Sequence, residues 1–220
     1  MALHLGDTAP DFTAETTAGT VNFHEWAGDS WVVLFSHPAD FTPVCTTELG
    51  RVAQLSAKWA ERGVKPIALS VDSVEDHATW VPDINEYNQT TVDYPIIADP
   101  DKAVAELYDM IHPGEGDTSS VRSVFVIDPA KKIRLTMTYP KSTGRNFDEI
   151  LRVVDALQEA DRGECATPVD WKVGERIIVP PTVPTEAARA KFDDVQEVYP
   201  YLRTARIRED AVGAGAVGCT

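Results

Sequence analysis

The sequence lacks any apolar run that could cross a membrane, and it lacks a leader-like start. No stretch approaches the roughly 18 consecutive apolar residues that a spanning helix needs. The first residues, Met1 to His4, have neither the basic start nor the apolar run of a signal peptide. We therefore expect a cytoplasmic protein that does not engage a membrane.

Basic residues are also scarce. The chain has 20 Lys and Arg against 35 Asp and Glu, a formal net charge of −15. A polyanion such as a nucleic acid, or an anionic membrane surface, would be repelled over most of such a protein. The composition therefore predicts that nucleic acid is not a partner.

Cysteine and metal-ligand patterns are sparse. The three cysteines, Cys45, Cys165 and Cys219, are widely spaced, no Cys-x-x-Cys occurs, and the five histidines are scattered. This pattern does not fit a secreted disulfide framework or a zinc site, so we expect no metal and no cofactor. In a reducing compartment such cysteines are catalytic, redox-active or simply buried.

The order of the predicted elements indicates an α/β fold. Apolar runs and helical spacing alternate along the chain, and the turn after Ile127 joins two strands as a hairpin. We predict a helix interrupted near Pro82 within 74–88. The predicted strands are 31–35, 65–71, 94–98, 123–127 and 133–139, and the predicted helices are 46–62, 74–88, 102–108 and 146–160.

The character of the chain changes at Asp161, after which prolines become frequent. We predict one domain over 1–160 and a loop-rich appendage over 161–220. The last residues, 211–220, are almost all small and rich in glycine, which is typical of a flexible tail.

The chemistry is expected where the strand 31–35 leads into a helix. With Thr42 as the N-cap, Pro43 takes the first helical position and Cys45 falls in the first turn. Unpaired amide N–H groups and the positive end of the helix dipole then favour the thiolate of Cys45, which is the nucleophilic form. A packing role is the alternative, because cysteine is among the most often buried residue types.

The neighbours of Cys45 favour catalysis. Pro38 can shield the sulfur from solvent, and the Thr42 hydroxyl can both donate to and accept from a peroxide oxygen. Peroxide reduction is a displacement on oxygen, so fixed donors around both oxygens would lower its barrier.

The spacing of Pro38, Thr42 and Cys45 resembles the Pro-x-x-x-Thr-x-x-Cys motif of the peroxiredoxins. Further stretches, at 36–38, 139–140, 143–150 and 166–171, resemble the 1-Cys group, and the resemblance fails only over about the last dozen residues. It implies a thioredoxin-like fold with an N-terminal extension. It also implies an antioxidant thiol peroxidase that reduces hydrogen peroxide and organic hydroperoxides through a sulfenic acid at Cys45.

The same resemblance implies roles for other residues and for partners. Arg122 matches the arginine that hydrogen-bonds the peroxide and holds the thiolate, Arg145 matches a second arginine behind it, and His37 would line or gate the pocket. The family forms homodimers in which the C-terminal region crosses to the partner, and often rings of dimers. An external thiol, thioredoxin-like, glutathione or a small dithiol, would supply the electrons.

The other two cysteines depart from a strict one-cysteine pattern. Some microbial members that resemble this chain use a cysteine near the C-terminus to attack the sulfenic acid of the partner subunit. We therefore predict that Cys219 resolves Cys45 across the dimer, with Cys165 secondary. Direct reduction of Cys45 by an outside thiol is the alternative.

Two other functions are open. Ser30 and His24 lie in a segment that resembles the Gly-x-Ser-x-Gly phospholipase segment of mammalian 1-Cys members, which would make the chain a phospholipase or esterase. The pattern is broken, since Val32 stands where that segment has glycine, and the expected acid aligns with Ala130, two residues from Asp128. A redox-regulated holdase chaperone would require a high-order assembly.

Overall fold

A computed structural model of the chain describes residues 3–116 and 118–208. The chain divides into two compact units, Met1–Phe147 and Asp148–Thr220. Within the described ranges, no helix is long and apolar enough to cross a membrane.

The first unit is built on a seven-stranded mixed sheet with the order β2-β1-β5-β4-β3-β6-β7. Strands β3, β4 and β5 are parallel neighbours, whereas β6 runs antiparallel to both β3 and β7. The strands are β1 (Thr13–Thr16), β2 (Gly19–Asn22), β3 (Trp31–Ser36), β4 (Val64–Ser70), β5 (Ile96–Ala98), β6 (Arg122–Ile127) and β7 (Ile133–Tyr139). The predicted α/β class and the predicted hairpin of β6 and β7 are confirmed.

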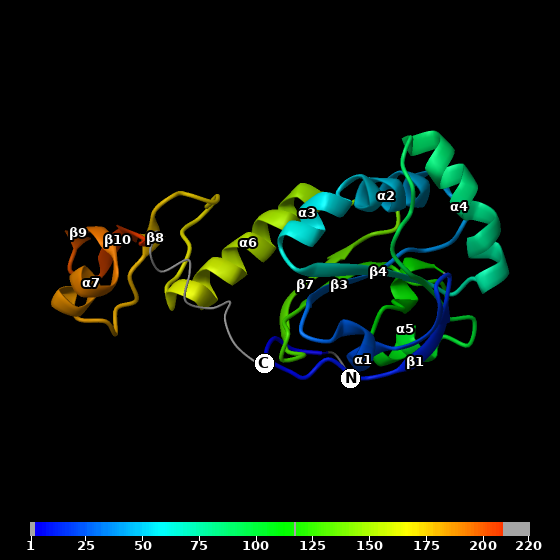
Figure 1. Ribbon diagram of the computed structural model, residues 1–220. Coiled ribbons are helices and arrows are strands. Elements are labelled where there is room, and N and C mark those ends of the chain that lie inside the picture. Colours follow the sequence, from blue (N-terminus) through cyan, green and yellow to red (C-terminus); the bar gives the residue numbers. More distant parts are fainter. Residues whose placement is uncertain (1–2, 117, 209–220) are drawn as a thin grey trace, which may run out of the picture. The chain divides into compact units, whose positions relative to one another are not determined.

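Helices cover both faces of this sheet. Figure 1 shows α2, α3 and α4 on one side of the strands and α1 and α5 on the other. The helices are α1 (Phe23–Ala27), α2 (Pro43–Gln54), α3 (Ser56–Glu61), α4 (Val74–Asn88) and α5 (Ala103–Leu107), with a 3₁₀ turn η1 (Pro113–Glu115).

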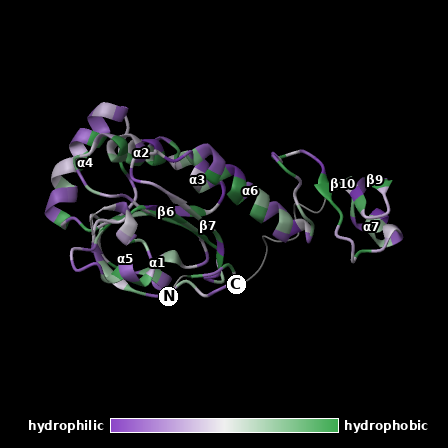
Figure 2. Cartoon of the chain, turned by 180° about the vertical axis from the view of Figure 1, so that it is seen from behind, coloured by the Kyte–Doolittle hydropathy of each residue, from purple (hydrophilic) through white to green (hydrophobic). Residues whose placement is uncertain are grey.

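Strand β3 shows why the sheet is buried on both faces. Its residues Val32 and Leu34 belong to an apolar cluster that includes Phe23 of α1 and Tyr108, which directly follows α5. Because successive side chains of a strand point to opposite faces, Val33 and Phe35 face the other side, where they are also buried. In Figure 2 the hydrophobic colour concentrates in the strands, while α4 is mostly hydrophilic.

Two helix predictions need correction. The range 46–62 predicted for a single helix is broken at Leu55 into α2 and α3, and α2 begins at Pro43, the first helical position expected after a Thr42 N-cap. The interruption predicted near Pro82 is absent, because α4 continues through it. Pro82 is exposed, so water can satisfy the carbonyl that its missing N–H leaves free.

Helix α4 begins where the sequence predicts, after Asp72 and Ser73. The Ser73 hydroxyl oxygen accepts from the backbone N–H of Asp76, and the Asp76 carboxylate accepts from the backbone N–H of Ser73. This capping box satisfies two amide groups that the first turn would otherwise leave unpaired.

The second unit holds more regular structure than its prolines suggest. It contains most of α6 (Phe147–Gly163), followed by β8 (Ile177–Ile178), α7 (Thr185–Lys191), β9 (Asp193–Tyr199) and β10 (Leu202–Arg206). The three strands form a sheet with the order β8-β10-β9. Its apolar core comprises Ile177, Val179, Ala188, Phe192 and Ala205.

Candidate active site

Cys45 lies in the first turn of α2, just beyond the end of β3. Thr42 has the extended backbone of an N-cap (φ −114°, ψ 145°), and Pro43 is the first helical residue, as the sequence predicts. Open α/β sheets bind their ligands beyond such strand ends. The cysteine side chain is fully buried, so protein atoms rather than bulk water surround the sulfur.

The Thr42 side chain does not cap the helix. Its hydroxyl donates to the carbonyl of Ala39 at 2.9 Å, so its hydrogen is engaged and its oxygen lone pairs are left to accept. Pro38, in the same loop, is buried. The loop 37–42 therefore carries both predicted neighbours of Cys45.

Arg122 meets Cys45 from β6. Its Nη1 lies 3.4 Å from the Cys45 sulfur, although the two residues are 77 positions apart in the chain. Its Nε and Nη2 both donate to the carbonyl of Lys141, at 2.9 and 2.8 Å. Because two of its three nitrogens are fixed on one carbonyl, the guanidinium holds a defined orientation toward the sulfur.

Glu48, one turn after Cys45 in α2, joins two arginines. Its Oε2 accepts from Arg122 Nη1 and from Arg145 Nη2, each at 2.7 Å. Burial raises the pKa of this carboxyl, but the charges and hydrogen bonds of Arg145 and the charge of Arg122 outweigh burial and hold the pKa below its ordinary value. Nothing in the sequence around Glu48 marks this role in advance.

Arg145 lies behind this pair and contacts the sheet. Its Nη1 donates to the carbonyls of Ser36 and Ser123, at 2.8 and 3.0 Å, and its Nε donates to Glu48 at 2.9 Å. The two arginines and one glutamate leave one net positive charge next to the Cys45 sulfur. That charge attracts a negative charge on the sulfur, since the surroundings are buried and screen it little.

His37 belongs to a second buried network beside the first. Its Nε2 is 2.8 Å from Asp40 Oδ1, and Asp40 Oδ2 is 2.5 Å from Nδ1 of His77. The ligand-type atoms of His37, Asp40 and Asp72 lie within 4.8 Å of one another. Each of these three side chains is hydrogen-bonded to a neighbouring group, so the three residues form part of a hydrogen-bonded network.

The other two predicted cysteines are Cys165 and Cys219. Cys165 lies in the second unit, partly buried, with its sulfur 3.7 Å from the carbonyl of Glu159. Burial, followed by the charge of Glu159, raises the pKa of the Cys165 thiol to about 11. Cys219 lies outside the described residues.

The residues of the alternative hydrolase are not assembled. The ring of His24 contacts the carbonyl of Ala9 at 2.8 Å and the carboxylate of Asp11 at 4.0 Å. Asp128 pairs with Arg134 instead of a histidine. No hydrogen bond between Ser30 and His24 occurs in the described part of the chain, so no activated serine is formed.

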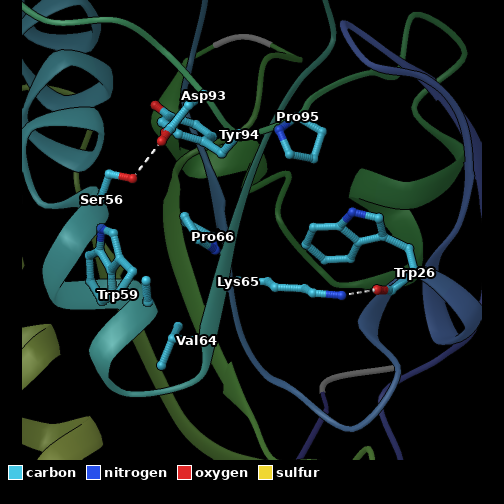
Figure 3. Close-up of a pocket in the computed structure, with 10 residues that line it drawn as sticks. Trp26, Ser56, Trp59, Val64, Lys65, Pro66, Asp93, Tyr94 and Pro95 are labelled. Carbon is cyan, nitrogen blue, oxygen red and sulfur yellow. Dashed lines mark hydrogen bonds between the residues drawn. The ribbon is translucent and has the colours of Figure 1, made fainter.

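A cavity of about 250 Å³ lies away from these residues, between α1, α3 and β4. Figure 3 shows its lining, in which Lys65 donates to the carbonyl of Trp26 and Ser56 contacts Asp93. None of the predicted site residues lines it.

Comparison with known proteins decides the family. Residues 5–136 match the AhpC/TSA family, and residues 156–194 match the C-terminal domain of 1-Cys peroxiredoxin. The chain belongs to the 1-Cys peroxiredoxins. It is 54% identical to peroxiredoxin-6 of Rattus norvegicus over 86% of this chain and 88% of the relative.

Solved peroxiredoxins have the same fold. Peroxiredoxin 6 of Arenicola marina, solved as a cysteine-to-serine mutant, has a TM-score of 0.90 at 44% identity, covering 94% of this chain and 100% of that one. A yeast mitochondrial 1-Cys peroxiredoxin has a TM-score of 0.88 at 49% identity, covering 92% and 99%. The peroxiredoxin described here therefore has a thioredoxin-like fold and is a thiol-dependent peroxidase, an oxidoreductase. These relatives do not favour the hydrolase or the holdase.

Proposed function

We propose that Cys45 is the residue that attacks the hydroperoxide. The observation that carries this proposal is the 3.4 Å contact between its sulfur and Arg122 Nη1, at the first turn of a helix. The structure describes two cysteines, Cys45 and Cys165. An arginine contacts the sulfur of Cys45. Burial raises the pKa of the Cys165 thiol, so Cys165 stays protonated at neutral pH.

In the reaction, the Cys45 thiolate attacks one oxygen of a hydroperoxide, ROOH. The S–O bond forms as the O–O bond breaks, sulfur loses two electrons, and the departing RO⁻ takes a proton to leave as ROH, or as water from hydrogen peroxide. Arg122 stabilises the negative charge that moves from sulfur to the departing oxygen. The product on the protein is the Cys45 sulfenic acid.

We also propose roles for the neighbouring residues. Thr42 accepts the hydrogen of the hydroperoxide on its free lone pairs, and Pro38 shields the sulfur from water. Arg145 supports Arg122 through Glu48. His37 lines or gates the pocket, as the family resemblance implies.

The sulfenic acid must then be reduced. Condensation with a thiol forms a disulfide and releases water, and a second thiol restores Cys45. We assign the first step to Cys219 of a partner subunit, with Cys165 secondary, or to an external thiol. The related yeast structure describes resolution through glutathione and thioredoxin systems, and we propose a thiol reductant of that kind here.

We further propose a homodimer, or a ring of dimers, in which the segment 161–220 is exchanged between subunits. Native mass measurement of the reduced protein would reveal it, and a monomer would contradict it. We place the protein in the cytoplasm, although one relative is named as mitochondrial. Cell fractionation with an antibody to the chain would decide between the two compartments.

The proposal is tested by Cys45→Ser. Peroxide turnover with a dithiol should fall to the level of the buffer, because serine is not a nucleophile at neutral pH. Cys165→Ser is the matched control and should retain turnover. A variant lacking Cys45 that still consumes peroxide would overturn the assignment.

A further inference from the structure

A chain of three buried ionisable groups runs behind the loop that leads into the active site. It joins His37 at the end of β3, Asp40 in the loop and His77 in α4, and all three side chains are at most 1% exposed. His77 also contacts the carbonyl of Ile97 in β5, with Nε2 3.1 Å from that oxygen. None of these contacts is used in the reaction proposed above.

The hydrogen bonds fix the number of protons in this chain. The Ile97 carbonyl can only accept, so His77 Nε2 carries a hydrogen. A second hydrogen must lie between His77 Nδ1 and Asp40 Oδ2, because two acceptors cannot approach to 2.5 Å. A neutral imidazole carries a hydrogen on only one of its two ring nitrogens. The pair of His77 and Asp40 therefore holds one proton more than a neutral imidazole beside a carboxylate would hold.

The third member is neutral. His37 donates from Nε2 to Asp40 Oδ1, and its buried Nδ1 has no partner within the described ranges. A hydrogen on Nδ1 would be a buried, unsatisfied donor, which is unfavourable. Burial lowers the pKa of His37, although Asp40 opposes the effect.

The surroundings of Asp40 favour its carboxylate form. Burial raises the pKa of Asp40, but hydrogen bonds and charges from both histidines outweigh burial and leave the pKa below its ordinary value. Asp72, in the turn after β4, is the other charged group that contacts the chain within the described residues. Its carboxylate accepts from the Asp40 backbone N–H at 3.0 Å and from Ser70.

The loop that contains Asp40 needs an anchor. Its next residue, Phe41, has φ of +55°, a left-handed conformation that is strained for a residue with a bulky side chain. Asp40 holds the loop by its backbone N–H and by both carboxylate oxygens. Thr42, at the loop's end, directly precedes the helix of Cys45.

We propose that Asp40 and His77 are positioning residues for the peroxidase reaction, and that the proton they share holds the loop 38–42 in the conformation that receives the hydroperoxide. This inference rests on the proposed function for what Thr42 and Pro38 do. Asp40 and His77 do not touch the substrate.

The anchor depends on the shared proton. Without it, a bare Nδ1 of His77 would face the Asp40 carboxylate, and the hydrogen bond between them would be lost. The lowered pKa of Asp40 favours the carboxylate form that this hydrogen bond requires.

Asp40→Asn separates the proton from the hydrogen bonds. The asparagine oxygen can accept from His37, and its amide can donate to a neutral His77 Nδ1, so every hydrogen bond survives without the extra proton. Asp40→Ala removes both side-chain hydrogen bonds, so the rate of Cys45 oxidation should fall roughly ten-fold or more, and Asp40→Asn should recover most of it. Asp83→Asn, at an exposed position of α4, is the matched control and should keep the wild-type rate.

The measurement is the ¹⁵N NMR spectrum of the His77 ring at neutral pH, together with single-turnover rates of Cys45 oxidation by hydrogen peroxide at the same pH. Two protonated ring nitrogens in the wild type and one in Asp40→Asn, with the slow rate confined to Asp40→Ala, support the proposal. A neutral His77 in the wild type, or a wild-type rate in Asp40→Ala, would overturn it. The ¹⁵N spectrum of His77 can also be recorded in Cys45→Ser, where it tests the shared proton independently of any reaction. Failure of the proposed function would instead appear as peroxide turnover that Cys45→Ser retains.

Discussion

At the scale of single residues, the active site depends on a balance of charge that the fold buries. Arg122 and Arg145 lie on either side of Glu48, and one positive charge remains beside the Cys45 sulfur. A buried ion pair contributes little to stability by itself, because both partners lose their hydration. The main effect of this cluster is to fix the orientation of the Arg122 guanidinium.

Arg122→Lys tests that orientation. Lysine keeps the charge but cannot contact the sulfur, Glu48 and the Lys141 carbonyl at once, because it lacks the planar fork. The second-order rate of Cys45 oxidation should fall roughly ten-fold or more. Stopped-flow kinetics with hydrogen peroxide would measure it, and a wild-type rate would show that the guanidinium does not act on the sulfur.

Cys45, Thr42 and Pro38 can be proposed from sequence because they are close together in the chain and their spacing has a physical meaning at a helix start. Arg122 was found only through the family resemblance, since no local pattern marks a residue 77 positions from the cysteine. Glu48 was passed over because a glutamate in a helix is ordinary until two buried arginines are seen around it.

At the scale of elements, α4 holds α2 in place around the reactive turn. The side-chain amide of Asn88 donates to the carbonyl of Thr46 at 3.0 Å, and the indole of Trp80 donates to the Thr46 hydroxyl at 3.3 Å. Thr46 directly follows Cys45. The hydrogen bond from Asn88 to Thr46 requires α2 and α4 to lie close together, and the absence of a side chain at Gly50 permits this approach.

Gly50→Ala should weaken this packing. A Cβ at position 50 would lie 2.0 Å from Asn88 Cγ, so the asparagine would have to move. Overpacking of this kind costs about 1–3 kcal/mol, which outweighs the helix preference of alanine, about 1 kcal/mol at most. Urea denaturation would measure the loss.

Gly114→Ala is the control for that experiment, because a Cβ there meets no atom within 4 Å. Its stability should be close to that of the wild type. Equal stability of Gly50→Ala and the wild type would mean that Asn88 does not hold the two helices together.

The elements themselves were largely predictable, since β3, β4 and the β6–β7 hairpin follow from apolar runs and turn residues. The break at Leu55 was not, because no glycine or proline marks it. The continuity of α4 through Pro82 was also missed. A helix prediction from sequence treats proline as a breaker, whereas an exposed position allows solvent to compensate.

At the scale of the whole molecule, the open question is how the sulfenic acid is resolved. The raised pKa of Cys165, about 11, leaves it a thiol at neutral pH and therefore a slow nucleophile. The raised pKa of Cys165 could not be predicted from sequence, because it depends on burial in the folded chain. Cys219 stays a prediction, since it lies outside the described residues.

One equivalent of peroxide followed by a non-reducing gel tests this prediction. Wild type should give a covalent dimer whose linked peptides contain Cys45 and Cys219, because condensation joins the sulfenic acid to a thiolate of the partner. Cys165→Ser should still form the dimer. A dimer that survives in Cys219→Ser, or a monomer band that persists in the wild type, would assign resolution to another thiol.

The central claim is that Cys45 is the residue oxidised by the hydroperoxide. Mass spectrometry of peptides, after a brief exposure to one equivalent of hydrogen peroxide and trapping of sulfenic acid, tests it most directly. The account predicts that the trapped modification appears first on the peptide that contains Cys45, and that prolonged excess peroxide converts the same residue to sulfinic acid. Oxidation that appears first at Cys165 or Cys219, with Cys45 untouched, would contradict it.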